Sequence, residues 1–285
     1  MTLEFFHGLS HGTGHIKRFV PYVSSGRTRA IIQFMPRNSI HIIPVRGVPE
    51  VKPGDDLSAL IVQAMQREAI GAEPGDVFVV AQKIVSKAEG RVVRLESVAP
   101  SKLALKWASD YDKDPRMVEV VLSETRRIVR MDHGVLISET YHGLVCANAG
   151  VDSSNVESGT VTLLPADPDL SARQIKQGLE ERLGVEAAVI VSDTFGRPWR
   201  DGLVNVALGV AGVPATEDLR GNADWKGQPL HVTVIAVADE LASAAELVMG
   251  KDGGIPVAIV RGFKYANSNQ SGRDLIRPAE LDMFR

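Results

Sequence analysis

Two aspartates in this sequence follow apolar runs rich in β-branched residues, and small residues or glycines surround both. Asp152 lies in the segment Cys146-Ala-Asn-Ala-Gly-Val-Asp-Ser-Ser-Asn155, and Asp193 follows the run Val189-Ile-Val-Ser192. A carboxylate in such a loop can hold a divalent cation, and the backbone N–H groups beside it can contact phosphate oxygens. These residue types and their positions predict a combined nucleotide and metal site.

The two aspartates differ in how far the sequence supports a metal role. Asp152 and Asn155 are equally typical of a turn closed by bonds from side chain to backbone, so both interpretations stay open for them. Asp193 directly follows five β-type residues, which puts it at a strand end rather than on a solvated face, and there we favour a metal ligand. Beyond it, Arg197 and Arg200 either bind carboxylates or phosphates through paired hydrogen bonds or solvate the surface around a turn.

Positive charge follows another apolar strand, where Lys83 and Lys87 stand with Ser86 and Gly90. Two lysines, a hydroxyl and a glycine can neutralise a polyphosphate, although the same run alone is typical of a solvated turn between strands. The run Gly250-Lys-Asp-Gly-Gly254 is an ordinary helix end, but its glycines also let the backbone approach a phosphate closely. Any nucleotide site is therefore expected to be assembled from several segments.

The common signatures of nucleotide and metal sites are absent from the sequence. It has no Gly-x-x-x-x-Gly-Lys-Ser/Thr loop, no Gly-x-Gly-x-x-Gly after a strand, no His-Glu-x-x-His and no Cys-x-x-Cys. His7, His11 and His15 have a metal-like spacing, but the glycines between them disfavour the helix that would align them. We therefore interpret this segment as a polar arm.

Composition excludes several classes of protein. With 44% hydrophobic and 24% charged residues, the 285-residue chain is typical of a soluble globular protein, and it has no apolar segment long enough to span a membrane. Its net charge of -3 gives no argument for a nucleic-acid or membrane partner. The single cysteine, Cys146, excludes an intramolecular disulfide and fits a reducing compartment, so we expect the cytoplasm.

The order of expected elements predicts an α+β fold with mixed or antiparallel sheets and flanking helices. Residues 1–40 carry five basic residues against Glu4 alone, and we expect them to be a poorly ordered extension. Residues 41–285 form the expected catalytic domain, as one unit or two interleaved α+β subdomains. Strands are expected over residues 40–45, 77–81, 91–95, 135–139, 143–147, 185–192, 232–238 and 256–261. Helices are expected within residues 100–130 and over residues 57–70, 171–183 and 239–249, the last two capped by Ser171 and Asp239.

Taken together, four motifs resemble the coenzyme F420-0:L-glutamate ligase family, and their order and spacing agree from about residue 42 to residue 261. The resemblance implies the family's own α+β fold, an intertwined homodimer, and the stand-alone form of the ligase. The motifs are Val48-Pro-Glu-Val-Lys-Pro-Gly-Asp-Asp-Leu57, Val85-Ser-Lys-Ala-Glu-Gly-Arg91, Asn148-Ala-Gly-Val-Asp-Ser-Ser-Asn-Val156 and Ser192-Asp-Thr-Phe-Gly-Arg-Pro-Trp-Arg-Asp-Gly202.

The resemblance also implies a reaction. The lactyl carboxylate of F420-0 is expected to be activated by GTP as an acyl phosphate and then attacked by the amino group of L-glutamate, releasing GDP and phosphate. Further glutamates can follow through γ-linkages. Mg²⁺ or Mn²⁺ is the implied metal, with K⁺ as an additional ion. The alternatives are a related amide ligase acting on a different acid, and a non-catalytic protein that binds GTP or metal.

Carried over position by position, the resemblance assigns Asp152, Asp193 and Lys87 as catalytic residues. It implies one metal ion shared by Asp152 and Asp193, and a second at Thr194. Paired cations and lysines suit phosphoryl transfer to a carboxylate, because two anions must be brought together. The implied nucleotide contacts are Val48, Pro49, Glu50, Val51, Gln82, Lys83, Lys87 and Asn155, joined by Gly250, Lys251, Asp252 and Gly253.

Overall fold

The computed structural model describes residues 17–24, 27–34 and 39–283, and the chain divides into two units, residues 1–40 and 41–285. In the first unit, β1 (Lys17–Ser24) and β2 (Arg27–Phe34) form an antiparallel pair that the sequence analysis does not include. Of the poorly ordered extension expected over residues 1–40, residues 1–16, 25–26 and 35–38 lie outside the described residues, and these include the three histidines. The site discussed below belongs wholly to the second unit.

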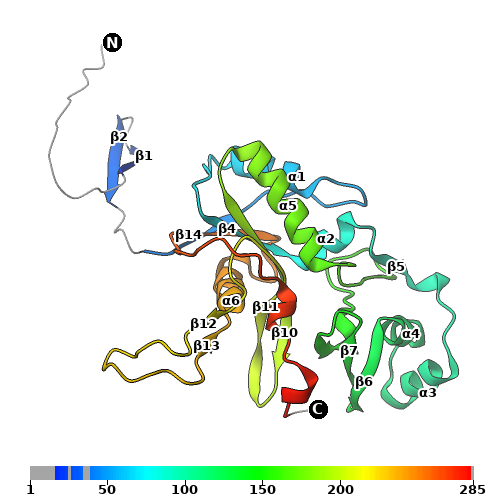
Figure 1. The fold of residues 1–285 in the computed structure, drawn as a ribbon. Coiled ribbons are helices and arrows are strands. Elements are labelled where there is room, and N and C mark those ends of the chain that lie inside the picture. Colours follow the sequence, from blue (N-terminus) through cyan, green and yellow to red (C-terminus); the bar gives the residue numbers. More distant parts are fainter. Residues whose placement is uncertain (1–16, 25–26, 35–38, 284–285) are drawn as a thin grey trace. The chain divides into compact units, whose positions relative to one another are not determined.

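A five-stranded mixed sheet is the centre of the second unit (Figure 1). Only β10 and β4 run parallel, and every other neighbouring pair is antiparallel. This mixture agrees with the predicted α+β class. In sheet order the strands are β11 (Arg200–Ala211), β10 (Ala187–Arg197), β4 (Asp76–Ala81), β14 (Val257–Arg261) and β3 (His41–Val45).

Helices cover both faces of this sheet (Figure 1). One face packs against α1 (Leu57–Arg67), α2 (Gln82–Ala88) and α5 (Pro168–Leu183), and the other against α6 (Val237–Met249). Burial on both faces explains why residues 77–80 form a continuous apolar run rather than an alternating one.

A buried ion pair fixes two neighbouring strands of the sheet. Arg261 of β14 donates to both carboxylate oxygens of Asp76 at the start of β4, at 2.8 and 2.6 Å. Both side chains are buried, and Arg261 also pairs with Glu73 at 2.7 Å, so the buried Asp76 carboxylate depends on Arg261 for compensation.

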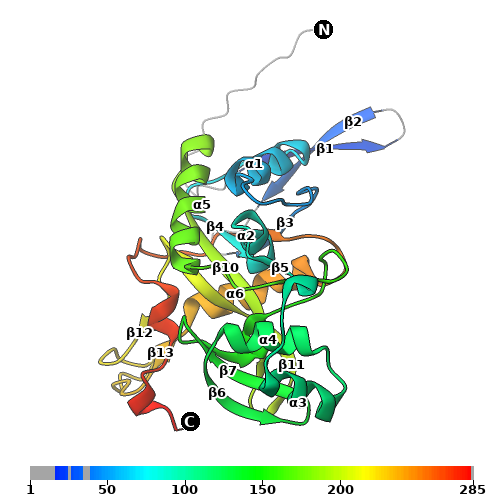
Figure 2. The same ribbon diagram turned by 90° about the vertical axis from the view of Figure 1, so that its right-hand side faces the viewer.

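A smaller group of elements has a hydrophobic core of its own, centred on Trp107, Val121, Leu136 and Val161 (Figure 2). Two short strands, β5 (Val92–Arg94) and β9 (Thr160–Thr162), pair beside it. The group contains α3 (Lys102–Tyr111), α4 (Pro115–Ser123), β6 (Thr125–Asp132), β7 (Val135–Thr140) and β8 (Val145–Ala147). The remaining elements are β12 (Glu217–Asp218), β13 (Val234–Ile235) and the 3-10 turns Leu95–Ser97, Asn148–Gly150, Gly272–Leu275 and Ala279–Leu281.

Three differences from the sequence analysis bear on the site. Asp193 lies inside β10 rather than at its end, because β10 continues to Arg197 as one arm of a long hairpin with β11. The partner strand β11 is not among the expected elements. Lys83 and Lys87 lie on a helix, α2, rather than on a turn.

Other boundaries also differ from those predicted. The helix α5 begins three residues before Ser171, because Asp167 accepts from the Leu170 N–H and serves as the N-cap. Asp239 lies in the first turn of α6 rather than at its cap, and the strand expected over residues 232–238 shrinks to β13. Residues 125–130, expected to be helical, instead belong to β6, which pairs with β7.

Candidate functional site

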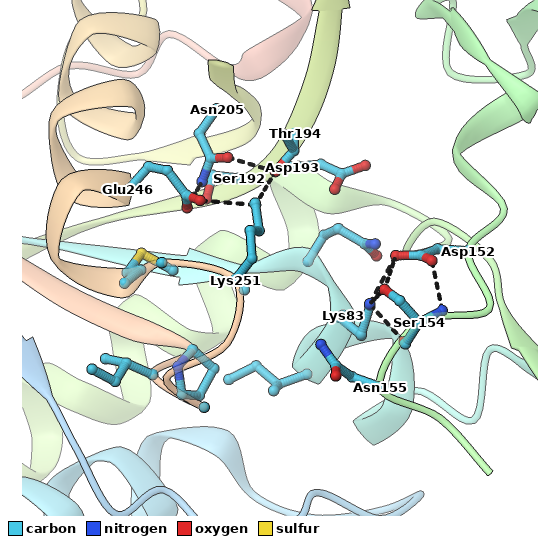
Figure 3. Close-up of a pocket in the computed structure, with 18 of the residues that line it drawn as sticks. Lys83, Asp152, Ser154, Asn155, Ser192, Asp193, Thr194, Asn205, Glu246 and Lys251 are labelled. Atoms are coloured by element: carbon cyan, nitrogen blue, oxygen red, sulfur yellow. Dashed lines mark hydrogen bonds and ion pairs between the residues drawn. The ribbon is translucent and has the colours of Figure 1, made fainter. Parts of the chain in front are cut away.

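A cavity of about 810 Å³ is lined by residues from five segments that are far apart in the sequence: 48–51, 81–87, 147–155, 192–205 and 246–256. Five of the candidate residues named above do not line it, namely Ser86, Gly90, Arg197, Arg200 and Gly253. The structure brings the others together, namely Val48, Pro49, Glu50, Val51, Gln82, Lys83, Lys87, Asp152, Asn155, Asp193, Thr194, Gly250, Lys251 and Asp252. Figure 3 labels six of them, namely Lys83, Asp152, Asn155, Asp193, Thr194 and Lys251.

Helix α2 directs two lysines toward the cavity. It begins directly after the buried strand β4, and the four-residue spacing puts Lys83 and Lys87 on one side of the helix. Lys83 Nζ lies 2.7 Å from Asp152 Oδ2 and donates to the carbonyl and hydroxyl oxygens of Ser154, each at 2.7 Å (Figure 3). The Lys83 ammonium thereby joins α2 to the loop that carries Asp152.

The second lysine is more deeply buried. Lys87 is 8% exposed, and its Nζ lies 2.6 Å from Glu50 Oε1 and 2.9 Å from the Asn155 carbonyl oxygen. The neighbouring Gln82 is also buried, and its Oε1 accepts from the Ser86 hydroxyl at 2.8 Å. Lys87 is therefore a buried cation whose partners are one largely exposed carboxylate and one neutral carbonyl.

Asp152 both closes a turn and faces the cavity. Ser154 donates its N–H to Asp152 Oδ1 at 2.7 Å, which is the expected turn bond, while the same carboxylate lines the cavity. Burial acts to raise the pKa of Asp152, but hydrogen bonds from Lys83 and Ser154 outweigh it and hold the pKa below its usual range. Asp152 is thus an anion compensated by the protein itself.

Asp193 has the opposite electrostatic character. Burial is the main cause that raises its pKa to about 6, and the nearby charge of Asp152 acts in the same direction. The Thr194 N–H, Lys251 and Lys83 lower the pKa only in part. A carboxylate with a raised pKa in a cavity is a candidate for binding a ligand, since an arriving cation relieves its unfavourable charge.

Beside Asp193, four side chains form a closed ring of polar contacts (Figure 3). Thr194 Oγ1 donates to Asn205 Oδ1 at 2.6 Å, and Asn205 Nδ2 donates to Glu246 Oε2 at 3.0 Å. Lys251 Nζ lies 3.0 Å from Glu246 Oε1 and also donates to Thr194 Oγ1. Within the described residues the buried Ser192 hydroxyl, in the same wall, has no hydrogen-bond partner.

The sequence analysis misses Ser192, Asn205 and Glu246 as site residues. The signal for Asn205 was a single amide within the apolar run from Leu203 to Ala211, where a buried polar side chain requires partners. Glu246 carries no such signal, because a carboxylate on a helix is usually solvated.

The donors in the cavity fit a hard cation. Carboxylate and hydroxyl oxygens are available at Asp152, Asp193 and Thr194, and Mg²⁺ usually takes one or two carboxylates with the remaining ligands from water and substrate phosphates. In the part of the chain that the structure describes, no group of three or more His, Cys, Asp and Glu side chains is placed to hold a metal ion. The cavity therefore suits a cation that arrives with a phosphate ligand better than one held by the protein alone.

Cys146 is unsuited to act as a nucleophile. The thiol is buried, and burial together with the nearby charge of Asp193 raises its pKa to about 12. Since the thiolate is the reactive form, the thiol is inert at neutral pH.

Comparisons with known proteins point to one family. A family model described as F420-0:Gamma-glutamyl ligase matches residues 47–262. The chain is 49% identical to the coenzyme F420:L-glutamate ligase of Methanothermobacter thermautotrophicus, over 86% of this chain and 99% of that protein. Proteins of the same name from Methanopyrus kandleri and Methanocaldococcus jannaschii are 46% and 45% identical, over 87% and 84% of this chain and 98% and 94% of their own lengths. No helix among the described residues is long and apolar enough to cross a membrane. With three quarters of its length matched by one family model, the chain belongs to the F420-0:gamma-glutamyl ligase family.

Proposed function

We propose that this protein joins L-glutamate to coenzyme F420-0 through an amide bond, in a reaction driven by GTP. The similarity to coenzyme F420:L-glutamate ligases supports the glutamate and F420 part of the proposal. The observation that carries the GTP part is the convergence of Lys83, Lys87, Asp152 and Asp193 on one cavity. Two lysines and two carboxylates suit phosphoryl transfer, in which the protein acts by positioning and charge neutralisation.

The proposed reaction has two steps. A carboxylate oxygen of F420-0 attacks the γ-phosphorus of GTP, the bond to the bridging oxygen breaks, and GDP leaves. The amino nitrogen of L-glutamate then attacks the carbonyl carbon of the acyl phosphate, the C–O bond to phosphate breaks, and the nitrogen gives up a proton. The products are F420-1, GDP and phosphate, and repetition would add further γ-linked glutamates.

The chain's own residues have distinct parts in this proposal. Lys83 and Lys87 donate to phosphate oxygens, and Asn155 and residues 48–51 contact the nucleotide together with the segment from Gly250 to Asp252. Asp152, Asp193 and Thr194 would hold Mg²⁺ or Mn²⁺, which would supply positive charge to offset the charges of the phosphate and the acceptor carboxylate. We also propose K⁺ as an additional ion, a homodimeric state and a cytoplasmic location.

Mass spectrometry tests the proposal directly. The purified protein is incubated with F420-0, L-glutamate, GTP and Mn²⁺ or Mg²⁺, and we expect a glutamyl adduct together with GDP. GDP without the adduct would point to a different acid acceptor. Neither product, combined with thermal stabilisation by GTP and metal, would instead identify a non-catalytic binding protein.

A further inference from the structure

The side chain of Asn205 lies at the centre of the ring beside Asp193. In the register of the hairpin, Asn205 of β11 is directly opposite Thr194 of β10, so the two side chains are cross-strand neighbours. Asn205 is 3% exposed, and a buried amide must satisfy both its donor and its acceptor. Both ends are satisfied within the ring.

The chemistry of these partners fixes the direction of every hydrogen bond between them. A carboxylate paired with a lysine only accepts, so the NH₂ end of Asn205 must face Glu246 and the carbonyl end must face Thr194. Asn205 Oδ1 also only accepts, so the Thr194 hydroxyl proton must point at it across 2.6 Å. What remains on Thr194 Oγ1 is its lone pairs, and one of them already accepts from the Lys251 ammonium.

Helix α6 holds this arrangement from two positions. Ser243 Oγ donates to the Asn205 carbonyl oxygen at 2.7 Å, and Glu246, one turn further along, accepts from the Asn205 side chain. The backbone and the amide of Asn205 are thus both fixed by one helix face, which leaves the amide no alternative orientation.

We infer that Asn205 and Glu246 are positioning residues that hold the Thr194 hydroxyl proton on Asn205 Oδ1, so that Thr194 Oγ1 offers a cation its remaining lone pair and no proton. A hydroxyl free to rotate would turn a proton toward the cation for part of the time. Residues that orient a metal ligand in this way commonly change metal affinity by about 10- to 100-fold when removed. The inference rests on the proposed metal site at Thr194 and assigns two residues that act on it without touching the metal.

The test measures metal binding rather than turnover. Free Mn²⁺ is titrated by electron paramagnetic resonance in the presence of GTP, with the wild-type protein and with Asn205→Leu, which keeps the volume and removes both hydrogen bonds. We expect the dissociation constant of Mn²⁺ to rise about 10-fold or more for Asn205→Leu. Glu246→Gln should raise it about 2- to 10-fold, because glutamine permits both orientations of the Asn205 amide.

A double-mutant cycle separates positioning from general damage. In a Thr194→Val background, Asn205→Leu should change Mn²⁺ affinity by less than about 2-fold, since its effect passes through the missing hydroxyl. Glu180→Gln is the matched control: its side chain is 29% exposed against 22% for Glu246, and it also pairs with a lysine, Lys176, but outside the cavity. It should leave Mn²⁺ affinity unchanged.

The outcomes distinguish the inference from the proposed function. If the wild-type protein with GTP binds no Mn²⁺, the proposed metal site fails and the inference fails with it. If the wild type binds Mn²⁺ and both Asn205→Leu and Glu246→Gln bind it equally well, only the inference is overturned. If Asn205→Leu lowers affinity as much in the Thr194→Val background as alone, the positioning role is overturned too. Thermal melts report folding, and should Asn205→Leu fail to fold, the milder Glu246→Gln decides the question.

Discussion

On one wall of the cavity, Asp152 is held by Lys83 and Ser154, whereas on the other wall Asp193 has no lysine within ion-pair distance among the described residues. We call the first the lysine wall (Lys83, Lys87, Asp152, Ser154 and Asn155) and the second the strand wall (Asp193, Thr194, Asn205, Glu246 and Lys251). The pKa of Asp152 is lowered and that of Asp193 is raised, although both are aspartates lining one cavity.

Under the proposed function, this difference would divide the binding of the anionic and the cationic ligand between the two walls. The lysine wall is neutralised internally, so its geometry is set before any ligand arrives, and its ammonium groups can exchange a carboxylate for a phosphate. On the strand wall the Asp193 carboxylate is disfavoured until a cation arrives, which makes binding of that cation more favourable. The predictions below aim at this contrast.

The largest effect is expected for Asp193→Asn. The change keeps the shape of the side chain but removes its charge, so we expect ligation to fall by about three orders of magnitude or more, in line with the loss of a ligand to a catalytic metal. The melting temperature should stay the same or rise, because a desolvated carboxylate is removed. The adduct is measured by mass spectrometry and stability by thermal melting.

Asp152→Asn provides the contrast on the lysine wall. Activity should also fall, but here the melting temperature should drop by about 2–4 °C, the shift that about 1 kcal/mol gives in a domain of this size. The reason is that Lys83 loses its charged partner. Equal stability changes for the two variants would remove the proposed difference between the walls.

The next effect concerns the nucleotide. In Lys87→Ala a buried ammonium is lost, and we expect the KM for GTP to rise by about tenfold or more, since hydrogen bonds to charged groups contribute about 1.5–3 kcal/mol. The KM for L-glutamate should change by about twofold at most. Steady-state kinetics with each substrate varied in turn measures both KM values. Equal increases in the two would contradict a contact between Lys87 and the phosphates.

Much of the fold could be predicted, because burial on both faces of the central sheet leaves a clear signal. The apolar run in β4 and the end of α6 at Gly250 were readable from the sequence, whereas the N-caps expected at Ser171 and Asp239 were wrong. The hairpin of β10 and β11 was not. Its strand β11 is exposed near the hairpin tip and buried from Ala207 onward, so neither a 2.0 nor a 3.6 residue period dominates.

The site residues also divide into those that could be predicted from the sequence and those that could not. Charged residues beside strands, such as Lys83, Asp152 and Asp193, can be identified as site candidates from their residue type and their position in the sequence. Asn205 and Glu246 act through contacts between β11 and α6, segments 41 residues apart, and no local pattern encodes that contact. Positioning residues are therefore harder to find from sequence than the ligands they orient.

A smaller effect is the pH dependence of stability. Because the pKa of Asp193 is raised above 3.8, to about 6, its contribution to the free energy of unfolding is fully present below about pH 4 and is lost as pH rises through about 6. Without metal or nucleotide, the melting temperature of Asp193→Asn should therefore rise relative to that of the wild type by about 2–4 °C between pH 5 and 6, the shift that about 1 kcal/mol gives. A constant difference across this range would contradict the raised pKa.

The smallest effect is expected for Ser154→Ala on the lysine wall. The variant removes the hydroxyl that donates to Asp152 Oδ2 at 2.9 Å and accepts from Lys83, but it keeps the Ser154 N–H bond to Asp152 and the ion pair between Asp152 and Lys83. One neutral hydrogen bond contributes about 0.5–1.5 kcal/mol, so we expect activity to fall by about 2- to 10-fold with no change in the metal requirement. The ion pair with Lys83 alone can hold Asp152 in place. A loss of activity as large as that of Asp193→Asn would therefore show that the geometry of the lysine wall is not fixed before ligands bind. That result would remove the proposed contrast between the two walls.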